Sequence, residues 1–245
     1  MKANFPLFCV LFFFLMDICA QDSTSVVPKR IYTTQALSGQ KAPVIDGLLN
    51  DASWNIVAWE NDFIEARPDE NTEPSNQTRF KIIYDQKFVY IGIQCLDNEP
   101  DKIVKRLSRR DTFDGDWIGV FIDSYYDKRT AFGFIVSAAG VKGDVFETNN
   151  GGNEDDSWNP IWYTKTNIDA EGWTAEMKIP LSQLKFGKSE EQVWGLEVMR
   201  RHFREEERSV WQRLPPDTPG FVSEFGELHG LLNLEPQKQL EIQPY

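Results

Sequence analysis

The sequence has little histidine and little cysteine. Its 245 residues include two histidines, His202 and His229, and three cysteines. Imidazole and thiolate groups are the usual zinc ligands, and they are frequent catalytic bases and nucleophiles, so their scarcity argues against a zinc centre or a histidine-based catalytic site. The sequence also has no Gly-x-Ser-x-Gly motif, no phosphate-binding loop and no Cys–His arrangement. These absences favour a binding protein over an enzyme.

Positive charge is also in short supply. The chain has 26 Lys and Arg against 38 Asp and Glu, a formal net charge of −12. This balance disfavours nucleic acid and anionic lipid surfaces as partners, and neutral or cationic ligands fit it better. With 41% hydrophobic and 13% aromatic residues, the chain has enough apolar surface to fold.

Long hydrophobic runs are missing except at the N-terminus. Residues 1–20 combine Lys2, an apolar core from Phe5 to Met16, and Ala20 before the expected cleavage point, which is typical of a secretory signal peptide. An uncleaved anchor would need about 20 apolar residues. Removal of this segment leaves Cys95 alone, so we expect no intrachain disulfide and a buried free thiol. The predicted divisions are a signal peptide at 1–20, a flexible lead at 21–34, a domain at 35–235 and a tail at 236–245.

Strand signals recur along the mature chain. The residues Trp173–Ile179 alternate strictly between apolar and polar, which indicates a strand with one buried face. Helical signal is confined to single turns, one after Asn50 as its N-cap and one after Pro180. Many short strands without βαβ alternation predict an all-β fold, an antiparallel β-sandwich. The expected strands are 77–84, 87–96, 116–123, 130–137, 141–148, 173–179, 193–202, 209–214 and 229–234.

Four stretches together resemble carbohydrate-binding module family 9. They are Pro43–Trp54 with its Asp46-Gly47 pair, the hairpin within 80–91, the run Asp116–Asp123, and the segment 172–184. The pair Trp194-Gly195 and the segment 225–228 close the match, which spans about residues 35–234. The resemblance implies an immunoglobulin-like or jelly-roll sandwich that binds poly- or oligosaccharide, often holds calcium, and assists enzymes that break polysaccharide down.

A narrower resemblance concerns the segment 158–162 and the pair Arg200-Arg201 after Trp194-Gly195. They are similar to secreted bacterial proteins in which such a module precedes a C-terminal membrane β-barrel. This resemblance implies export to the periplasm or cell surface of a Gram-negative bacterium, with an outer-membrane barrel or a glycoside hydrolase as partner. We expect the module itself to be monomeric and non-catalytic.

Aromatic side chains are the candidate sugar platforms, because the C–H face of a sugar ring packs on an aromatic ring. The family clamps its ligand between two tryptophans; Phe113 occupies the first position and Phe221 lies near the second. Three polar positions of the family correspond here to Gly119, Ile135 and Met199. We expect Trp54, Trp173 and Trp194 in the core. The predicted carbohydrate-binding residues are Phe113, Trp117, Trp158, Trp162, Arg200, Trp211 and Phe221.

Two acidic clusters are the candidate calcium ligands. The first contains Asp111, Asp114 and Asp116, and the second includes Asp155 and Asp156. Calcium prefers six to eight oxygen ligands, which acidic loops supply. Neither cluster has the spacing of an EF-hand.

Two other functions stay open at this point. One is a structural or protein-interaction domain attached to an outer-membrane barrel, without sugar binding. The other is haem or cofactor binding, which the sequence supports poorly because Met199 and His202 would point to opposite faces of one strand.

Overall fold

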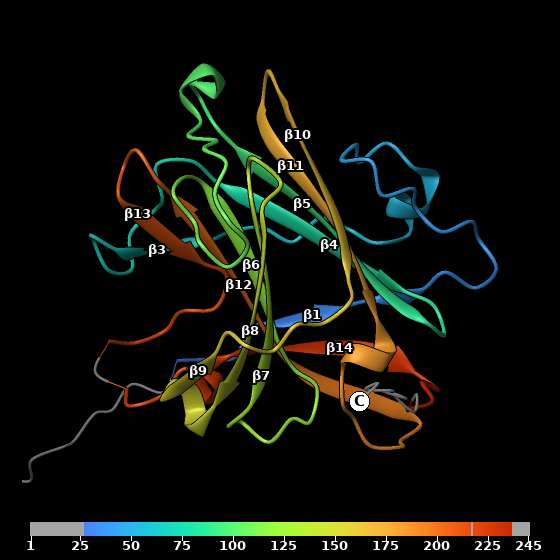
Figure 1. The fold of residues 1–245 in the computed structure, drawn as a ribbon. Coiled ribbons are helices and arrows are strands. Elements are labelled where there is room, and N and C mark those ends of the chain that lie inside the picture. The colour runs from blue at the N-terminus through green and yellow to red at the C-terminus, as the bar shows by residue number, and fades with distance from the viewer. Residues whose placement is uncertain (1–26, 217, 237–245) are drawn as a thin grey trace, which may run out of the picture.

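The protein folds into two β-sheets packed face to face, as the computed structural model in Figure 1 shows. The structure describes residues 27–216 and 218–236. The predicted signal peptide, residues 21–26 of the lead and the tail from residue 237 lie outside the described residues. Within the described ranges every helix is a short 3-10 turn, so the prediction of an all-β sandwich is confirmed. None of these turns is long and apolar enough to cross a bilayer.

The larger sheet has nine strands. Seven of them follow the order β1-β14-β12-β6-β7-β8-β9, and β13 pairs with both β12 and β3. The pair of β1 with β14 is parallel, whereas the remaining pairs are antiparallel. The strands are β1 (Ile31–Thr33), β3 (Ile64–Arg67), β6 (Trp117–Asp123), β7 (Ala131–Ser137), β8 (Lys142–Thr148), β9 (Asn153–Asp155), β12 (Glu191–His202), β13 (Glu207–Val210) and β14 (Gly226–Leu232).

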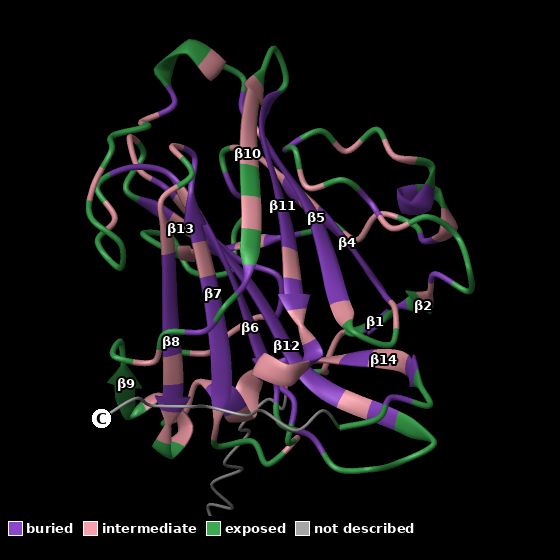
Figure 2. Cartoon of the chain, turned by 45° about the vertical axis from the view of Figure 1, so that its right-hand side comes forward, coloured by how far each residue is buried: buried purple, intermediate pink, exposed green. Residues whose placement is uncertain are grey.

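The smaller sheet has five strands in the order β10-β11-β5-β4-β2. Only the pair of β2 with β4 is parallel among its described strands. Figure 2 shows that β10 is largely exposed at the edge of this sheet, whereas β5 and β11 inside it are buried. The strands are β2 (Gln35–Ala36), β4 (Thr78–Tyr84), β5 (Phe88–Leu96), β10 (Tyr163–Asp169) and β11 (Gly172–Pro180).

The strands predicted from alternation are present. The runs 77–84 and 87–96 form the hairpin β4–β5, and the runs within 116–148 form the antiparallel meander β6-β7-β8. The alternating run 173–179 is the interior strand β11. The prediction at 209–214 was too long, because β13 ends at Val210. The short strands β1, β2, β3 and β9 and the edge strand β10 were not predicted.

The lead is shorter than predicted. Residues 31–33, assigned to the flexible lead, form β1 and pair with Glu227–His229 of β14. The next strand, β2, joins the other sheet, so the first strands of the chain bridge the two layers.

The described helical segments are five 3-10 turns. The turn after Asn50 has Asp51 at its N-cap position without a side-chain capping bond, so the prediction of Asn50 as N-cap was wrong. The turn after Pro180 is present as predicted. The turns are η1 (Ala52–Ile56), η2 (Pro100–Lys102), η3 (Asn149–Gly151), η4 (Leu181–Gln183) and η5 (Val222–Glu224).

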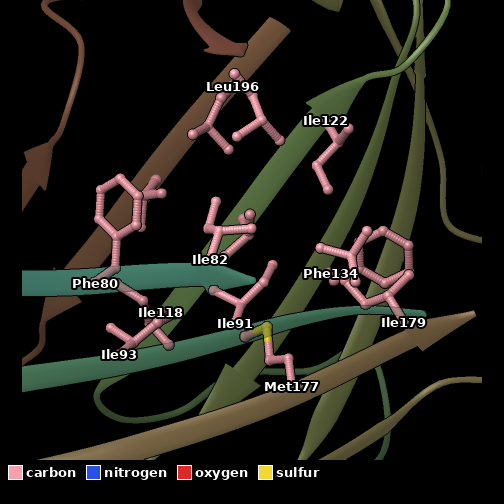
Figure 3. Close-up of a cluster of buried hydrophobic side chains, with 14 of the residues drawn as sticks. Phe80, Ile82, Ile91, Ile93, Ile118, Ile122, Phe134, Met177, Ile179 and Leu196 are labelled. Atoms are coloured by element: carbon pink, nitrogen blue, oxygen red, sulfur yellow. The ribbon is translucent and has the colours of Figure 1, made fainter. Parts of the chain in front are cut away.

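The hydrophobic core fills the space between the sheets. Figure 3 shows Ile82 and Ile91 of the smaller sheet facing Ile118 and Leu196 of the larger one. Because side chains alternate along a strand, every second residue of β6 enters this core, and the residues between them point to the outer face of the nine-stranded sheet. Trp54, Trp173 and Trp194 are buried as predicted, and Cys95 is a buried free thiol whose pKa burial raises to about 12.

Candidate functional site

A cleft of about 740 Å³ lies on the outer face of the nine-stranded sheet. Its floor belongs to β6, β7 and β8, and one wall to β3 and β13, strands that lie next to one another in Figure 1. Along β6, Ile118 and Val120 point into the core, whereas Trp117 and Phe121 point into the cleft. The volume is within the range of sites that bind small molecules, about 300–1,000 Å³.

The floor is apolar and has its own hydrophobic cluster. Phe121 packs with Val145 of β8, Met199 of β12 and Val210 of β13, separately from the main core. Gly133 makes room for the Phe121 ring, because a Cβ at this position would lie 2.9 Å from its Cε1 atom. The sheet therefore carries hydrophobic packing on both faces, and the outer packing holds the cleft floor in place.

Two phenylalanines line the cleft from loops. The Phe113 ring centroid lies 6.2 Å from that of Trp117, and the Phe221 centroid lies 5.3 Å from that of Phe121. Each phenylalanine packs on a glycine that has no side chain to block it, Gly143 under Phe113 and Gly151 under Phe221. The cleft thus offers aromatic surface from β6 and from two separate loops.

A pair of acids lies at one end of the cleft. Glu147 of β8 is paired in register with Glu154 of β9, and both line the cleft. Burial, and then repulsion from Glu154, raise the pKa of Glu147 to about 7. The Oε2 atom of Glu147 is buried and has no hydrogen-bond partner among the described residues. A buried acceptor without a partner costs stability, so this oxygen is an unsatisfied group beside the cleft.

Three of the seven predicted binding residues line this cleft: Phe113, Trp117 and Phe221. Ile135 and Met199, which replace polar positions of the resembled family, line it as well. Gly119 lies on β6 between Trp117 and Phe121. The cleft therefore brings together residues that are far apart in the sequence. Before the structure, only the family resemblance linked them.

The other three predicted aromatic platforms are elsewhere. Trp211 is fully buried, packs on Phe80 and donates from Nε1 to Glu60. Trp162 is buried against Phe134, so both predictions were wrong.

Trp158 is half-buried and packs on the opposite side of the sheet from the cleft. Its ring contacts Phe132 and Phe134, which belong to the main core. Trp158 therefore does not line this cleft, and its role in sugar binding stays a prediction.

Arg200 does not line the cleft either. Its side chain is completely buried, and Nη1 donates to the carbonyl oxygens of Asn76 and Gln77 at 3.2 and 3.3 Å. Its neighbour Arg201 is half-buried and is paired in register with Trp117, on the opposite face of β12. One step along a strand exchanges the two faces, so Arg200 and Arg201 lie in different environments.

The predicted calcium ligands do not come together. Asp116 is fully buried and accepts backbone N–H groups from Val104 and Phe203, at 2.8 and 3.4 Å. Burial raises the pKa of Asp116. Asp114 instead forms an exposed ion pair with Arg106.

The remaining acids are also engaged or separate. Asp111 accepts the Asp144 backbone N–H and lines the cleft, Asp155 accepts the Ser157 N–H, and Asp156 lines the cleft. Across residues 27–216 and 218–236, no three His, Cys, Asp or Glu side chains are arranged to hold a metal ion. The five aspartates therefore do not fit a shared calcium site, and calcium binding stays a prediction.

Sequence reasoning missed the charged residues of the cleft. Arg67, Glu147, Glu154 and Arg208 lie on four different strands, and no motif connects them. The register of β3 with β13 and of β8 with β9 brings them to the same face. Only knowledge of the strand register would have allowed these four residues to be placed in one cleft.

The chain matches the family described as carbohydrate family 9 binding domain-like over residues 45–213. The chain belongs to this family. No curated protein sequence matches it significantly.

Solved structures with this fold include two of a family 9 carbohydrate-binding module from Caldicellulosiruptor kristjanssonii, one in complex with glucose and one with cellotriose. Each is 18% identical, with a TM-score of 0.60, and the match covers 88% of this chain and 100% of that one. A putative carbohydrate-binding protein from Bacteroides uniformis is 12% identical, with a TM-score of 0.66 over 82% of this chain and 99% of that one. These similarities show the fold of the family 9-like module.

Proposed function

We propose that this family 9-like module binds poly- or oligosaccharide in the cleft on β6, β7 and β8, without catalysing a reaction. The observation that carries the proposal is the position of Phe113, Trp117 and Phe221 around one cleft. Sugar rings pack their C–H faces on such rings, while the surrounding charged groups exchange hydrogen bonds with hydroxyls. Two solved structures of similar fold contain glucose and cellotriose, which makes these sugars the first probes to use.

The test is isothermal titration calorimetry with cellotriose and a glycan array to widen the search. We expect Trp117→Ala to weaken the binding of the preferred glycan about 30-fold, since a central aromatic contact is worth about 2 kcal/mol. The matched control is Tyr163→Ala, which removes a ring that is 52% exposed on β10 of the other sheet. Equal binding by the Trp117 variant and the wild type, with both folded, would remove the cleft from the proposal. Failure to bind any glycan would favour the structural or protein-interaction alternative.

The proposal of a non-catalytic role has its own test, because Glu147 and Glu154 are two carboxylates facing one cleft. Glycoside hydrolysis uses such a pair, with one member kept protonated by a raised pKa. We expect no release of reducing sugar from soluble glucan or xylan. Turnover that is abolished by Glu147→Gln while the fold is retained would show that the module is an enzyme.

We further propose that the protein is exported by the signal at residues 1–20 and assists polysaccharide breakdown as a monomer, beside an outer-membrane barrel or a glycoside hydrolase. The signal-like residues and the narrower resemblance support this proposal. Cell fractionation combined with mass spectrometry of the mature N-terminus tests it. A new N-terminus at Gln21 in the periplasmic or surface fraction is expected, and an intact Met1 in the cytoplasm would contradict it.

A further inference from the structure

Three arginines form one cross-strand row next to the aromatic floor. The backbone register pairs Trp117 with Arg201, Arg201 with Arg208, and Arg208 with Arg67. Directly paired residues of neighbouring strands point to the same face of a sheet. The row therefore crosses β6, β12, β13 and β3 on the face that carries the cleft, and Arg67 and Arg208 line the cleft directly.

The two arginines that line the cleft have no acidic partner. Across the described residues, neither Arg67 nor Arg208 belongs to an ion pair. The Nε atom of Arg208 is buried and has no hydrogen-bond partner there. The third arginine of the row, Arg201, does have a hydrogen-bond partner, because its Nη1 atom donates to the carbonyl oxygen of Glu206 at 2.7 Å. A buried donor without a partner costs stability unless a ligand satisfies it.

The row also concentrates like charge. Burial is the main cause that lowers the pKa of Arg208, and repulsion from Arg67 and Arg201 lowers it further. Glu154 acts in the opposite direction and is the weakest of these influences. Like charges directly opposite each other on neighbouring strands are destabilising. An anion bound between the guanidinium groups would remove this repulsion.

The position of Arg208 also suits a sugar ring. Its Cζ atom lies over the Trp117 ring, 5.8 Å from the ring centroid, so the guanidinium group packs on one face of this ring. A guanidinium group presents parallel N–H donors that match the two oxygens of a carboxylate. A ring packed on Trp117 would bring a carboxylate at its edge within reach of the row.

We propose that Arg67 and Arg208 bind the carboxylate of an acidic sugar, so that the cleft selects glycans containing uronic acid. This inference rests on the proposed function, because it names the class of sugar for the same cleft. It also revises the expectation, drawn from the net charge, that neutral or cationic ligands fit this protein better. The value of −12 describes the whole chain, whereas a bound carboxylate responds to charges within about 10 Å. Six acids also line the cleft. Three of them are paired with other arginines, Asp111 and Asp144 with Arg110 and Glu70 with Arg213. Glu147, Glu154 and Asp156 would face the uncharged hydroxyls.

The test compares three ligands of the same shape by calorimetry at low ionic strength. They are cellotriose, the triuronate made by oxidising each of its C6 hydroxymethyl groups to a carboxylate, and the methyl ester of that triuronate. We expect the triuronate to bind about tenfold more tightly than the ester, or better, because charge-assisted hydrogen bonds form only with the free acid. This preference should decrease as salt is added.

Variants of the row test whether its arginines cause the preference for the free acid. Arg67→Gln and Arg208→Gln should each reduce the preference for the free acid to less than about threefold, while the ester binds as before. Arg67 is exposed, so its variant tests the row even if Arg208→Gln does not fold. The control, Lys165→Gln, removes the same charge from β10 of the other sheet and should keep the preference.

The outcomes separate the two proposals. Equal or weaker binding of the triuronate, with cellotriose binding that depends on Trp117, would overturn the acidic subsite and leave the proposed function standing. A preference for the acid that survives both arginine variants would also overturn the subsite. Failure of all three ligands and of a uronic-acid array would overturn the acidic subsite, and failure on the general glycan array as well would overturn both proposals.

Discussion

The buried carboxyl group of Glu197 should make the stability of this protein depend on pH. One oxygen, Oε1, accepts three backbone N–H groups, from Val198 at 2.9 Å, Trp211 at 3.0 Å and Gln212 at 3.1 Å. The other oxygen, Oε2, is buried without a partner among the described residues. Burial outweighs the hydrogen bonds and raises the pKa of Glu197 to about 8.

The sign follows from proton linkage. The native state holds this proton more tightly than the unfolded state, in which the pKa is 4.5. Stability is therefore unaffected below pH 4.5, and it falls as pH rises from there until the native group also ionises near pH 8. Each pH unit inside this window costs about 1.4 kcal/mol. The free energy of unfolding should decrease by about 3 kcal/mol between pH 5.5 and 8 from this group alone.

The assay is urea unfolding of the wild type and Glu197→Gln at several pH values. Glutamine keeps the accepting oxygen and cannot ionise, so the difference between the two proteins should move by about 3 kcal/mol in favour of the variant from pH 5.5 to 8. Taking the difference matters because Asp123 and Glu147 also have raised pKa values, of about 6 and about 7, and ionise in both proteins. A difference that stays constant to within about 1 kcal/mol would refute the reasoning.

Three further predictions concern the cleft, the core and calcium. Gly143→Ala should weaken glycan binding with little change in melting temperature, because the new methyl group would collide with the Phe113 ring; unchanged affinity in calorimetry would contradict this. Trp211→Ala should lower the free energy of unfolding by about 3–5 kcal/mol in a urea titration, as expected for a core tryptophan, and a loss below about 1 kcal/mol would count against its burial. Thermal melts with excess calcium and with EDTA test the predicted stabilisation by calcium, and coincident curves would exclude it.

The strands of the fold could be predicted because their signal is local. The alternation in Trp173–Ile179 indicates a strand, and the short step at Asp85-Gln86 indicates a hairpin between two antiparallel strands. The prediction that only one face of the alternating strand is buried was wrong, because Thr174 and Glu176 on its polar face are also buried. Most of the strands that were missed are short, such as β1 and β9 with three residues each, and depend on pairing with distant strands. The missed strand β10 has seven residues, but it is an edge strand without a buried residue. Their own residues carry too little pattern to indicate them.

The residues of the candidate site could not be predicted from local sequence patterns alone. Alternation shows that Arg200 and Arg201 face opposite ways, but it does not show which face of the sheet is covered by the other sheet. Trp117 and Trp211 are both tryptophans on or next to strands, yet one lines the cleft and the other is fully buried. Packing of the whole domain decides between these environments.

The fold class follows from composition and alternation, and the family from the resemblance of a few short motifs, so both could be predicted from the chain alone. Only the tertiary structure decided which aromatic rings share a cleft and that Arg67, Arg201 and Arg208 stand in one row. The physical reason is that strand register and the choice of the exposed face are set by contacts between residues far apart in the chain.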